Sequence, residues 1–294
     1  MCKYSVLFIA CMVYVSSERD MLIVVNYQND FQIGGAMGKP ENEENRKNQS
    51  FINSHLPLLI DLFKDDEIVV SQENHPKDHI SFFSFHKRIN QGRSGVSAYL
   101  GDHFDPNDIK SLEVLYEKDS LNFDFTPGDR YVINGYFYTK REYFDPDTEV
   151  PVRQNLFPDH CIKQTFGVEL QEDVHQALNK VLDKSKVIPV FELGSAKGMD
   201  DLSLVQNTAG EEHKKFLKII THDINRIFLT GVFMEYVVIN TALDLLHRFP
   251  DKQIYIVQDL TLSFLEKSLA VNTIKENHPD ITFISFQQIQ LQKK

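Results

Sequence analysis

Several residues that could carry chemistry follow short apolar runs in this chain of 294 residues. Glu73 and His75 stand two apart just beyond the run Glu67–Ser71, so an extended backbone turns both side chains to one side. Carboxylate and imidazole groups are common metal ligands. His160 and Cys161 are adjacent, so an extended backbone turns them to opposite sides. We therefore do not expect Cys161 to serve as a nucleophile beside His160.

Apolar runs and helical patterns predict the elements that position these residues. The strand-like runs are Met21–Asn26, Glu67–Ser71, Val187–Phe191, Arg226–Thr230, Gln253–Val257 and Ile281–Phe286. Helical patterns cover 51–63, 209–221, 234–248 and 262–276, and a charged loop is predicted over 40–50. This alternation predicts an α/β fold, a three-layer α/β/α sandwich with a central, mostly parallel sheet of about six strands. Ligands of such sheets bind beyond the carboxyl ends of the strands.

Composition and charge exclude several classes of protein. The chain is 42% hydrophobic, which is enough for a buried core. The net charge of −11 argues against a general nucleic-acid binder. No stretch beyond the N-terminus approaches the ~20 apolar residues of a membrane span. Three cysteines are too few for a disulfide scaffold.

The N-terminal segment and one internal segment differ from the rest of the chain, and they define the predicted domain organisation. Met1–Ser17 has a lysine, a short apolar run and small residues, which predicts a signal peptide and hence a secreted or endomembrane-lumen protein. The alternative is a buried first strand in a cytoplasmic protein. Residues 18–294 are predicted to form a single domain. Residues 87–156, with a strand-like segment at Arg130–Asn134, fit the alternation poorly and are interpreted as an insertion: a lid, an oligomer contact or an ornament.

Four segments in chain order carry recognisable motifs: LIVVNYQNDFQIGGAM (22–37), EIVVSQENHPKDHISF (67–82), FPDHC (157–161) and GVFMEYVV (231–238). They resemble the motifs of the nicotinamidase/isochorismatase family of cysteine hydrolases, in its nicotinamidase branch. The matching residues are Gln28, Asn29, Asp30, Phe31, Gly34, Gly35, His75, Pro76, His79, Ser81, Phe82, Pro158, His160, Cys161, Gly231, Val232, Glu235 and Val238. The resemblance implies the isochorismatase-like fold.

The resemblance also implies which positions would carry catalysis. The family attacks an amide or similar carbonyl with a Cys, which an Asp deprotonates while a Lys favours the charged forms. These positions fall at Val237, Asn26 and Leu193. Valine cannot form an acyl intermediate, and a neutral amide cannot accept the thiol proton. Lys197-Gly198 could instead be aligned with the family's Lys-Gly pair, but Leu193 keeps the family's spacing.

The metal positions of the resemblance keep suitable residue types. The family's Asp and two His correspond to Glu73, His75 and His160, a set that suits zinc, iron or manganese with open coordination positions. The alternative is that the two histidines are only packing residues. His79 matches a supporting histidine rather than a ligand. The resemblance further implies a pocket for a small pyridine-like ligand, bounded by Phe31, Asn26 and Val237, and a homo-oligomer.

The remaining motif residues are interpreted as structural. Gln28 and Asp30 are expected to fix the turn after the first strand, and Glu235 to cap the helix that begins near Met234. Asp259 is expected to be a cap or turn residue.

Two functions follow from this pattern. The first is a catalytically inactive nicotinamidase-like protein, a pseudoenzyme that keeps the fold, with or without the metal and the ligand pocket. The second is a metal-dependent amidohydrolase, which cleaves nicotinamide or a related amide without the Cys, Asp and Lys. That second function requires a general base, which the sequence does not identify.

Overall fold

The structure is a computed structural model, and it describes residues 19–79, 81–82, 84, 130–133, 136–142, 149–153, 157–182, 187–197, 201–205, 212–264 and 267–293. The signal peptide predicted at Met1–Ser17 lies outside these residues, as does most of the insertion predicted at 87–156. The described part of that insertion forms a separate antiparallel sheet of β3 (Arg130–Ile133), β4 (Tyr136–Glu142) and β5 (Glu149–Arg153).

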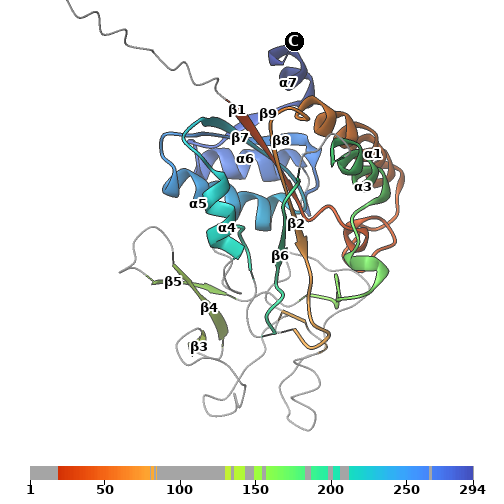
Figure 1. Cartoon of the computed structure of the whole chain (residues 1–294). Helices are drawn as coiled ribbons and strands as arrows, with labels where there is room; N and C mark the ends of the chain where they lie inside the picture. The colour runs from red at the N-terminus through yellow and green to blue at the C-terminus, as the bar shows by residue number, and fades with distance from the viewer. Residues whose placement is uncertain are drawn as a thin grey trace, which may run out of the picture.

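A six-stranded sheet in the order β6-β2-β1-β7-β8-β9 forms the centre of the fold (Figure 1). Every pair of neighbouring strands in it is parallel. The strands are β1 (Arg19–Val25), β2 (Glu67–Glu73), β6 (Val190–Leu193), β7 (Ile224–Gly231), β8 (Gln253–Thr261) and β9 (Thr282–Ile284). The predicted parallel sheet is confirmed.

Both faces of this sheet are buried, as the continuous apolar runs predict. In β1, Leu22 and Val24 pack into one hydrophobic cluster, while Ile23 and Val25 pack into a second cluster on the opposite face. Alternate side chains of a strand point to opposite faces, so an unbroken apolar run is stable only where helices cover both.

Helices form the outer two layers, which confirms the three-layer sandwich (Figure 1). One face is covered by α1 (Glu43–Leu62), α3 (Glu172–Leu182) and α7 (Phe286–Gln292). The opposite face is covered by α4 (Glu212–Ile219), α5 (Ile239–Arg248) and α6 (Lys267–Asn277). No helix in the described part of the chain is long and apolar enough to cross a membrane.

Several details of the sequence prediction are wrong. The strand predicted at Val187–Phe191 lies at Val190–Leu193. The charged loop predicted over 40–50 is largely helical, because α1 begins at Glu43, where the side chain of Asn42 accepts from the amide of Asn45 at 2.8 Å. The first two turns of α1 are mostly exposed, so they show no apolar periodicity. The predicted last strand ends at Ile284, and Phe286 begins α7 after a capping box at Ser285. The sequence prediction also missed α3.

Candidate functional site

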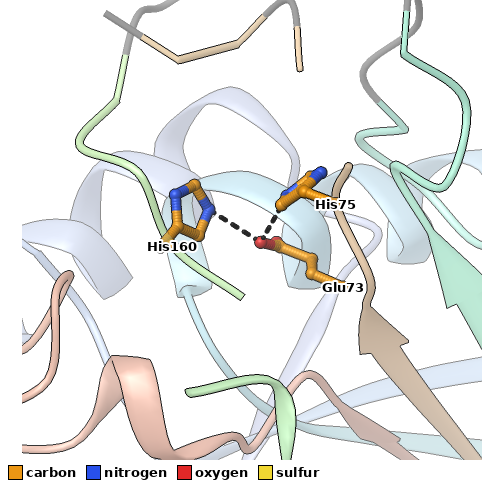
Figure 2. A group of neighbouring side chains, drawn as sticks. All are labelled: Glu73, His75 and His160. Atoms are coloured by element: carbon orange, nitrogen blue, oxygen red, sulfur yellow. Dashed lines mark hydrogen bonds and ion pairs between the residues drawn. The ribbon is translucent and has the colours of Figure 1, made fainter. Parts of the chain in front are cut away.

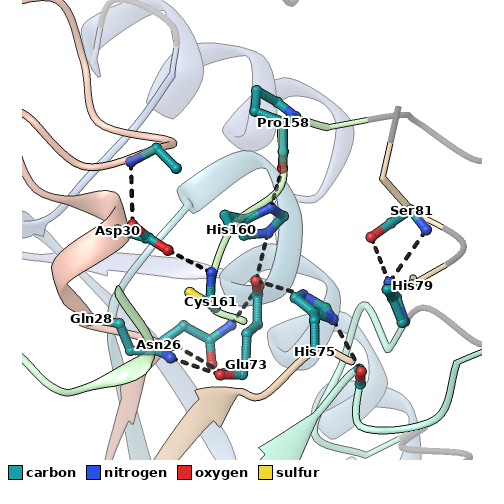
Figure 3. Close-up of polar contacts among 12 residues, drawn as sticks. Asn26, Gln28, Asp30, Glu73, His75, His79, Ser81, Pro158, His160 and Cys161 are labelled. Carbon is teal, nitrogen blue, oxygen red and sulfur yellow. Dashed lines mark hydrogen bonds and ion pairs between the residues drawn. The ribbon is translucent and has the colours of Figure 1, made fainter. Parts of the chain in front are cut away.

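The candidate site lies beyond the carboxyl ends of β6, β2, β1 and β7, where ligands of parallel sheets bind. Glu73 is the last residue of β2 and pairs in register with Leu193, the last residue of β6. Asn26 directly follows β1, and the π-helix η4 (Met234–Val238) follows β7. Figure 3 shows the polar contacts of the residues around this edge.

Glu73, His75 and His160 converge on one point (Figure 2). Their ligand-type atoms all lie within 4.8 Å of one another. Oε2 of Glu73 lies 3.1 Å from Nε2 of His75 and 2.8 Å from Nε2 of His160. Both imidazoles are buried, and the Glu73 side chain is 13% exposed. The fold therefore brings together the three residues at the expected metal positions, although His160 is distant in sequence.

The hydrogen bonds of the second ring nitrogen, Nδ1, in each imidazole indicate whether these residues fit a metal. Nδ1 of His75 lies 3.0 Å from the carbonyl oxygen of Gly194, and Nδ1 of His160 lies 2.7 Å from that of Pro158. A carbonyl oxygen only accepts, so each Nδ1 carries a proton and donates it. In a neutral ring, Nε2 then turns a lone pair toward the Glu73 carboxylate.

Three electron-pair donors that face one point repel one another unless a cation lies among them or protons occupy the nitrogens. A histidine that donates Nδ1–H to a backbone carbonyl while aiming Nε2 at a shared centre is the usual arrangement of a metal ligand. Two imidazoles and one carboxylate also suit a divalent ion of the zinc or iron type. The residues present therefore fit a divalent metal.

Glu73 is held in its charged form. Burial would raise the pKa of its carboxyl, but when protons occupy Nε2 of His160 and His75, the hydrogen bonds from these nitrogens outweigh burial and hold that pKa well below its usual range. An ionised carboxylate in this position offers negative charge to a cation.

Asn26 donates to the same carboxylate from the other side. Its Nδ2 donates to Oε1 of Glu73 at 3.0 Å, and its Oδ1 accepts from the hydroxyl of Ser71 at 2.6 Å. The backbone of Asn26 has φ of +46°, a left-handed conformation that asparagine tolerates better than most residues. The side chain is fully buried. Asn26 therefore orients the Glu73 carboxylate. It is not among the residues that line the small cavity next to Glu73, although the sequence placed it at the edge of a ligand pocket.

The backbone of Gly194 packs directly against the imidazole of His75. Its φ is +62°, and a Cβ at this position would lie 2.1 Å from Cε1 of His75. Its amide donates to Oδ2 of Asp201 at 2.8 Å, while its carbonyl accepts from His75. The missing side chain thus allows the backbone to lie directly against the imidazole.

Gln28 and Asp30 were expected to fix the turn after the first strand; in the structure, Asp30 bonds within that turn to the amide of Ala36, and both residues also bond to distant segments. Gln28 bonds to both the amide and the carbonyl of Glu73, at 2.9 and 2.7 Å. Oδ2 of Asp30 accepts from the amide of Cys161 at 2.6 Å, which fixes the segment that carries His160. Both side chains act on backbone groups.

A cavity of about 30 Å³ lies beside Glu73 and His160. Glu73, His160, Asp201 and Val237 line it, together with the apolar side chains of Phe31, Met37, Phe157, Leu202, Phe233, Tyr236 and Phe264. Tyr236 packs edge-on against Phe157 and Phe264, with ring centroids 5.6 and 5.5 Å away. A cavity needs only ~10–15 Å³ of such space to hold one water molecule, so this one is of the size of one or two waters. In this conformation the aromatic side chains fill the space that a ring-shaped ligand would need.

Two of the three positions aligned with the family's catalytic residues, Val237 and Leu193, belong to a hydrophobic cluster. Val237 is 4% exposed and lines the cavity. Leu193 is buried in the core on the α4–α6 face of the sheet. Lys197, the other residue that could be aligned with the family's lysine, is 57% exposed and forms an ion pair with Asp78. Neither Leu193 nor Lys197 lines the cavity.

Cys161 faces away from the cavity, as its adjacency to His160 predicts. Its Sγ lies 3.9 Å from the carbonyl oxygen of Gly167 within the core on the α1–α3 face. Burial, with the nearby charges of Glu73 and Asp30, raises the pKa of the thiol well above its ordinary value. The thiolate that nucleophilic attack requires is therefore disfavoured.

Three other predicted roles can be compared with the structure. Glu235 does not cap its own helix; it accepts from the hydroxyl of Ser263 and from the amide of Phe264, and so holds the loop after β8. Asp259, expected to be a cap or turn residue, lies within β8 and accepts from the amide of Phe286, the first residue of α7, at 3.0 Å, in addition to the cap that Ser285 provides. His79 bonds to Ser81 and lies outside the metal-ligand cluster.

Sequence reasoning missed three residues of the site: Asp201, Gly194 and Tyr236. Asp201 follows another aspartate in a segment of ordinary loop composition, so nothing marks it in the sequence. Gly194 directly follows β6, which ends two residues later than the strand predicted at Val187–Phe191, so its position at a strand end was not visible in the sequence. The ring of Tyr236 reaches the cavity from a distorted backbone, with φ of −122° and ψ of −106°, that no pattern indicates.

Two curated proteins are similar in sequence, although no protein-family model matches the chain. A nicotinamidase of Saccharomyces cerevisiae is 26% identical over 225 residues, which are 76% of this chain and 79% of that protein. A nicotinamidase of Escherichia coli is 24% identical over 229 residues, which are 76% of this chain and 75% of that protein. The similarity therefore spans most of both relatives.

Solved structures share the fold. The yeast nicotinamidase bound to nicotinaldehyde has a TM-score of 0.57 at 22% identity, over 90% of this chain and 99% of its own. A pyrazinamidase of Pyrococcus horikoshii in complex with zinc has a TM-score of 0.51 at 19% identity, over 91% of this chain and 99% of its own. Both are matched over nearly their whole length.

Proposed function

Because the chain belongs to the isochorismatase-like family, as a relative of its nicotinamidases, we propose that it binds a divalent metal but does not hydrolyse amides by cysteine chemistry. Glu73, His75 and His160 would hold the metal. When bound, such an ion can polarise a ligand's carbonyl or a water molecule. The protein's own residues would orient the ligands and exclude water.

One observation carries the inactive part of this proposal: at the position aligned with the family's cysteine, η4 presents Val237 to the cavity. A cysteine route requires a thiolate there, a carboxylate to take its proton and a cation nearby. Asn26 is an amide engaged with Glu73 and Ser71, and Leu193 is a core residue. Losing even one such member costs several orders of magnitude in rate.

The lining and the volume of the cavity beside Glu73 also restrict which ligand can bind. Aromatic walls suit a planar ring, and the yeast relative was solved with nicotinaldehyde. The present volume of about 30 Å³ admits no such ring unless an aromatic side chain moves. We therefore propose that a pyridine-type ligand enters this site only when Tyr236 swings away from Phe157.

A second candidate is a metal-dependent amidohydrolase, and Asp201 is the observation that favours it. This buried carboxylate lines the same small cavity as Glu73 and His160. Asp201 would therefore supply the general base that the sequence did not identify. In this candidate Asp201 accepts a proton from the attacking water.

Ammonia release from nicotinamide separates the candidates. Metal-loaded protein is assayed as wild type, in EDTA, and as Cys161→Ser, His160→Ala and Asp201→Asn. We expect no release above the blank. Release that Cys161→Ser abolishes would overturn the proposal in favour of a cysteine route. Release that EDTA, His160→Ala and Asp201→Asn abolish, but Cys161→Ser does not, would establish the second candidate.

Metal content is tested separately by elemental analysis. We expect about one divalent ion per chain, lost in His160→Ala and retained in His175→Ala, a change of an exposed histidine on α3. Equal metal content in both variants, or none in the wild type after incubation with zinc and desalting, would remove the metal from the proposal.

A further inference from the structure

A second cavity, of about 210 Å³, shares a wall with the cavity beside the metal ligands. Phe31 and Phe233 line both cavities, and their rings meet edge to face at 5.3 Å between centroids. Leu262 extends the apolar wall. None of Glu73, His75 and His160 lines the second cavity, so it is a separate compartment.

Cationic side chains reach the second cavity from two elements that are far apart in the sequence. Lys39 comes from the segment before α1, and Lys267 is the first residue of α6. One carboxylate, that of Glu44, lines the same cavity. The lining therefore carries an excess of positive charge, in a chain whose net charge is −11.

The ammonium of Lys267 is partly withdrawn from water. Burial lowers the pKa of Lys267; the charge of Asp259 raises it, and the charge of Lys39 lowers it further. The group has three donors, and the carbonyl oxygen of Asp259 accepts one of them at 3.4 Å. An anion in the cavity would offset both the burial and the repulsion from Lys39.

The size and the walls of the cavity restrict the kind of anion. Pockets for drug-sized ligands measure ~300–1,000 Å³, so this one suits a ligand of about one ring. Phe31, Phe233 and Leu262 favour an apolar body, whereas the lysines favour a carboxylate at one end. We infer that this cavity binds a planar aromatic monocarboxylate, with its carboxylate at Lys267 and Lys39 and its ring against Phe31 and Phe233.

Benzoate is the probe, because it has the ring and the carboxylate but lacks a ring nitrogen for a metal. Its binding to the full chain is measured by isothermal titration calorimetry, beside benzamide, a neutral molecule of the same shape. We expect benzoate to saturate one site, and benzamide to bind at least tenfold more weakly because it lacks the charge-assisted hydrogen bond.

Variants locate the site. Lys267→Gln should weaken benzoate binding at least tenfold, while Lys275→Gln, two turns further along α6 and outside the cavity, should leave it unchanged. Lys39→Gln serves as a second probe if Lys267→Gln fails to fold. A benzoate affinity that is equal in Lys267→Gln and Lys275→Gln, or in Lys39→Gln and wild type, would overturn the inference.

The proposed metal site is tested apart from this one. Benzoate binding should persist in EDTA and in His160→Ala, because His160 does not line the second cavity, although its ring packs against Phe31 at 5.6 Å between centroids. Binding that disappears in both would assign benzoate to the metal, and so overturn this inference while supporting the metal site. No saturation of the wild type up to ~10 mM benzoate would also overturn it.

Discussion

The side-chain amide of Asn26 donates to Oε1 of Glu73 at 3.0 Å, while Oε2 of the same carboxylate lies 2.8 Å from Nε2 of His160. The amide therefore holds one oxygen of Glu73 and leaves the other for the histidines. The glutamate at position 73 and the asparagine at position 26 form one unit, since the neutral amide can donate where a carboxylate could only accept.

Changing Asn26→Asp should disturb this unit. The new carboxylate would lie beside Glu73, so we expect a loss of about 1–3 kcal/mol in the free energy of unfolding at neutral pH without metal. Repulsion raises the pKa of one carboxyl in the folded state. The loss should therefore be absent below the unfolded pKa of about 4, grow as the pH rises to the raised folded value, and stay constant above it.

Urea denaturation in EDTA at several pH values measures this effect. Asn29→Asp is the matched control, because Asn29 donates to the carbonyl oxygen of Phe166 at an exposed position. Equal stability losses in both variants would contradict the proposed pairing of Asn26 with Glu73.

Gly194→Ala should displace His75. A Cβ would overlap the imidazole, and the left-handed φ would strain any residue with a side chain. We expect zinc affinity to fall about 10–100-fold, the range typical for a lost supporting contact. Zinc titration with a competing chelator measures the change, and Ser195→Ala provides the neighbouring control. Unchanged affinity in Gly194→Ala would show that His75 does not depend on this close approach.

Tyr236→Ala should open the cavity beside the metal ligands. Burial, with the nearby charge of Glu235, raises the pKa of Tyr236 to about 12, so the ring remains a neutral packing group at physiological pH. Removal of the ring should cost about 3 kcal/mol in stability but allow nicotinaldehyde to bind. Calorimetry should detect binding in Tyr236→Ala and none in Tyr236→Phe, which keeps the ring. Equal binding to both variants would mean that another side chain closes the cavity.

Cys161 should resist alkylation in the folded protein. Its buried thiol has a raised pKa, so the reactive thiolate is scarce at pH 8. Mass spectrometry of the peptide that contains Cys161 should find little iodoacetamide adduct under native conditions and full modification in guanidinium. Rapid native modification would show that the thiol reaches solvent, and would reopen the question of its role.

Much of the fold could be predicted from sequence because the central strands are buried on both faces. Unbroken apolar runs such as Met21–Val25 mark a strand without any knowledge of its neighbours. The start of α1 was missed because helix residues that face water leave no apolar period. The start of α7 did have a local signal, the pair Ser285 and Gln288 that forms its capping box.

The sequence by itself determined the types of chemical group available: a carboxylate and an imidazole two residues apart, a further histidine, and a valine in a motif that elsewhere carries a cysteine. These follow from residue identity and local spacing. Only the tertiary structure decided that His160 meets Glu73, that Asn26 donates to it, and that Asp201 lines the same cavity. It also decided that Phe157 and Tyr236 are among the side chains that line that cavity of about 30 Å³. Such relationships join residues far apart in the chain, and they depend on side-chain packing, which no local pattern encodes.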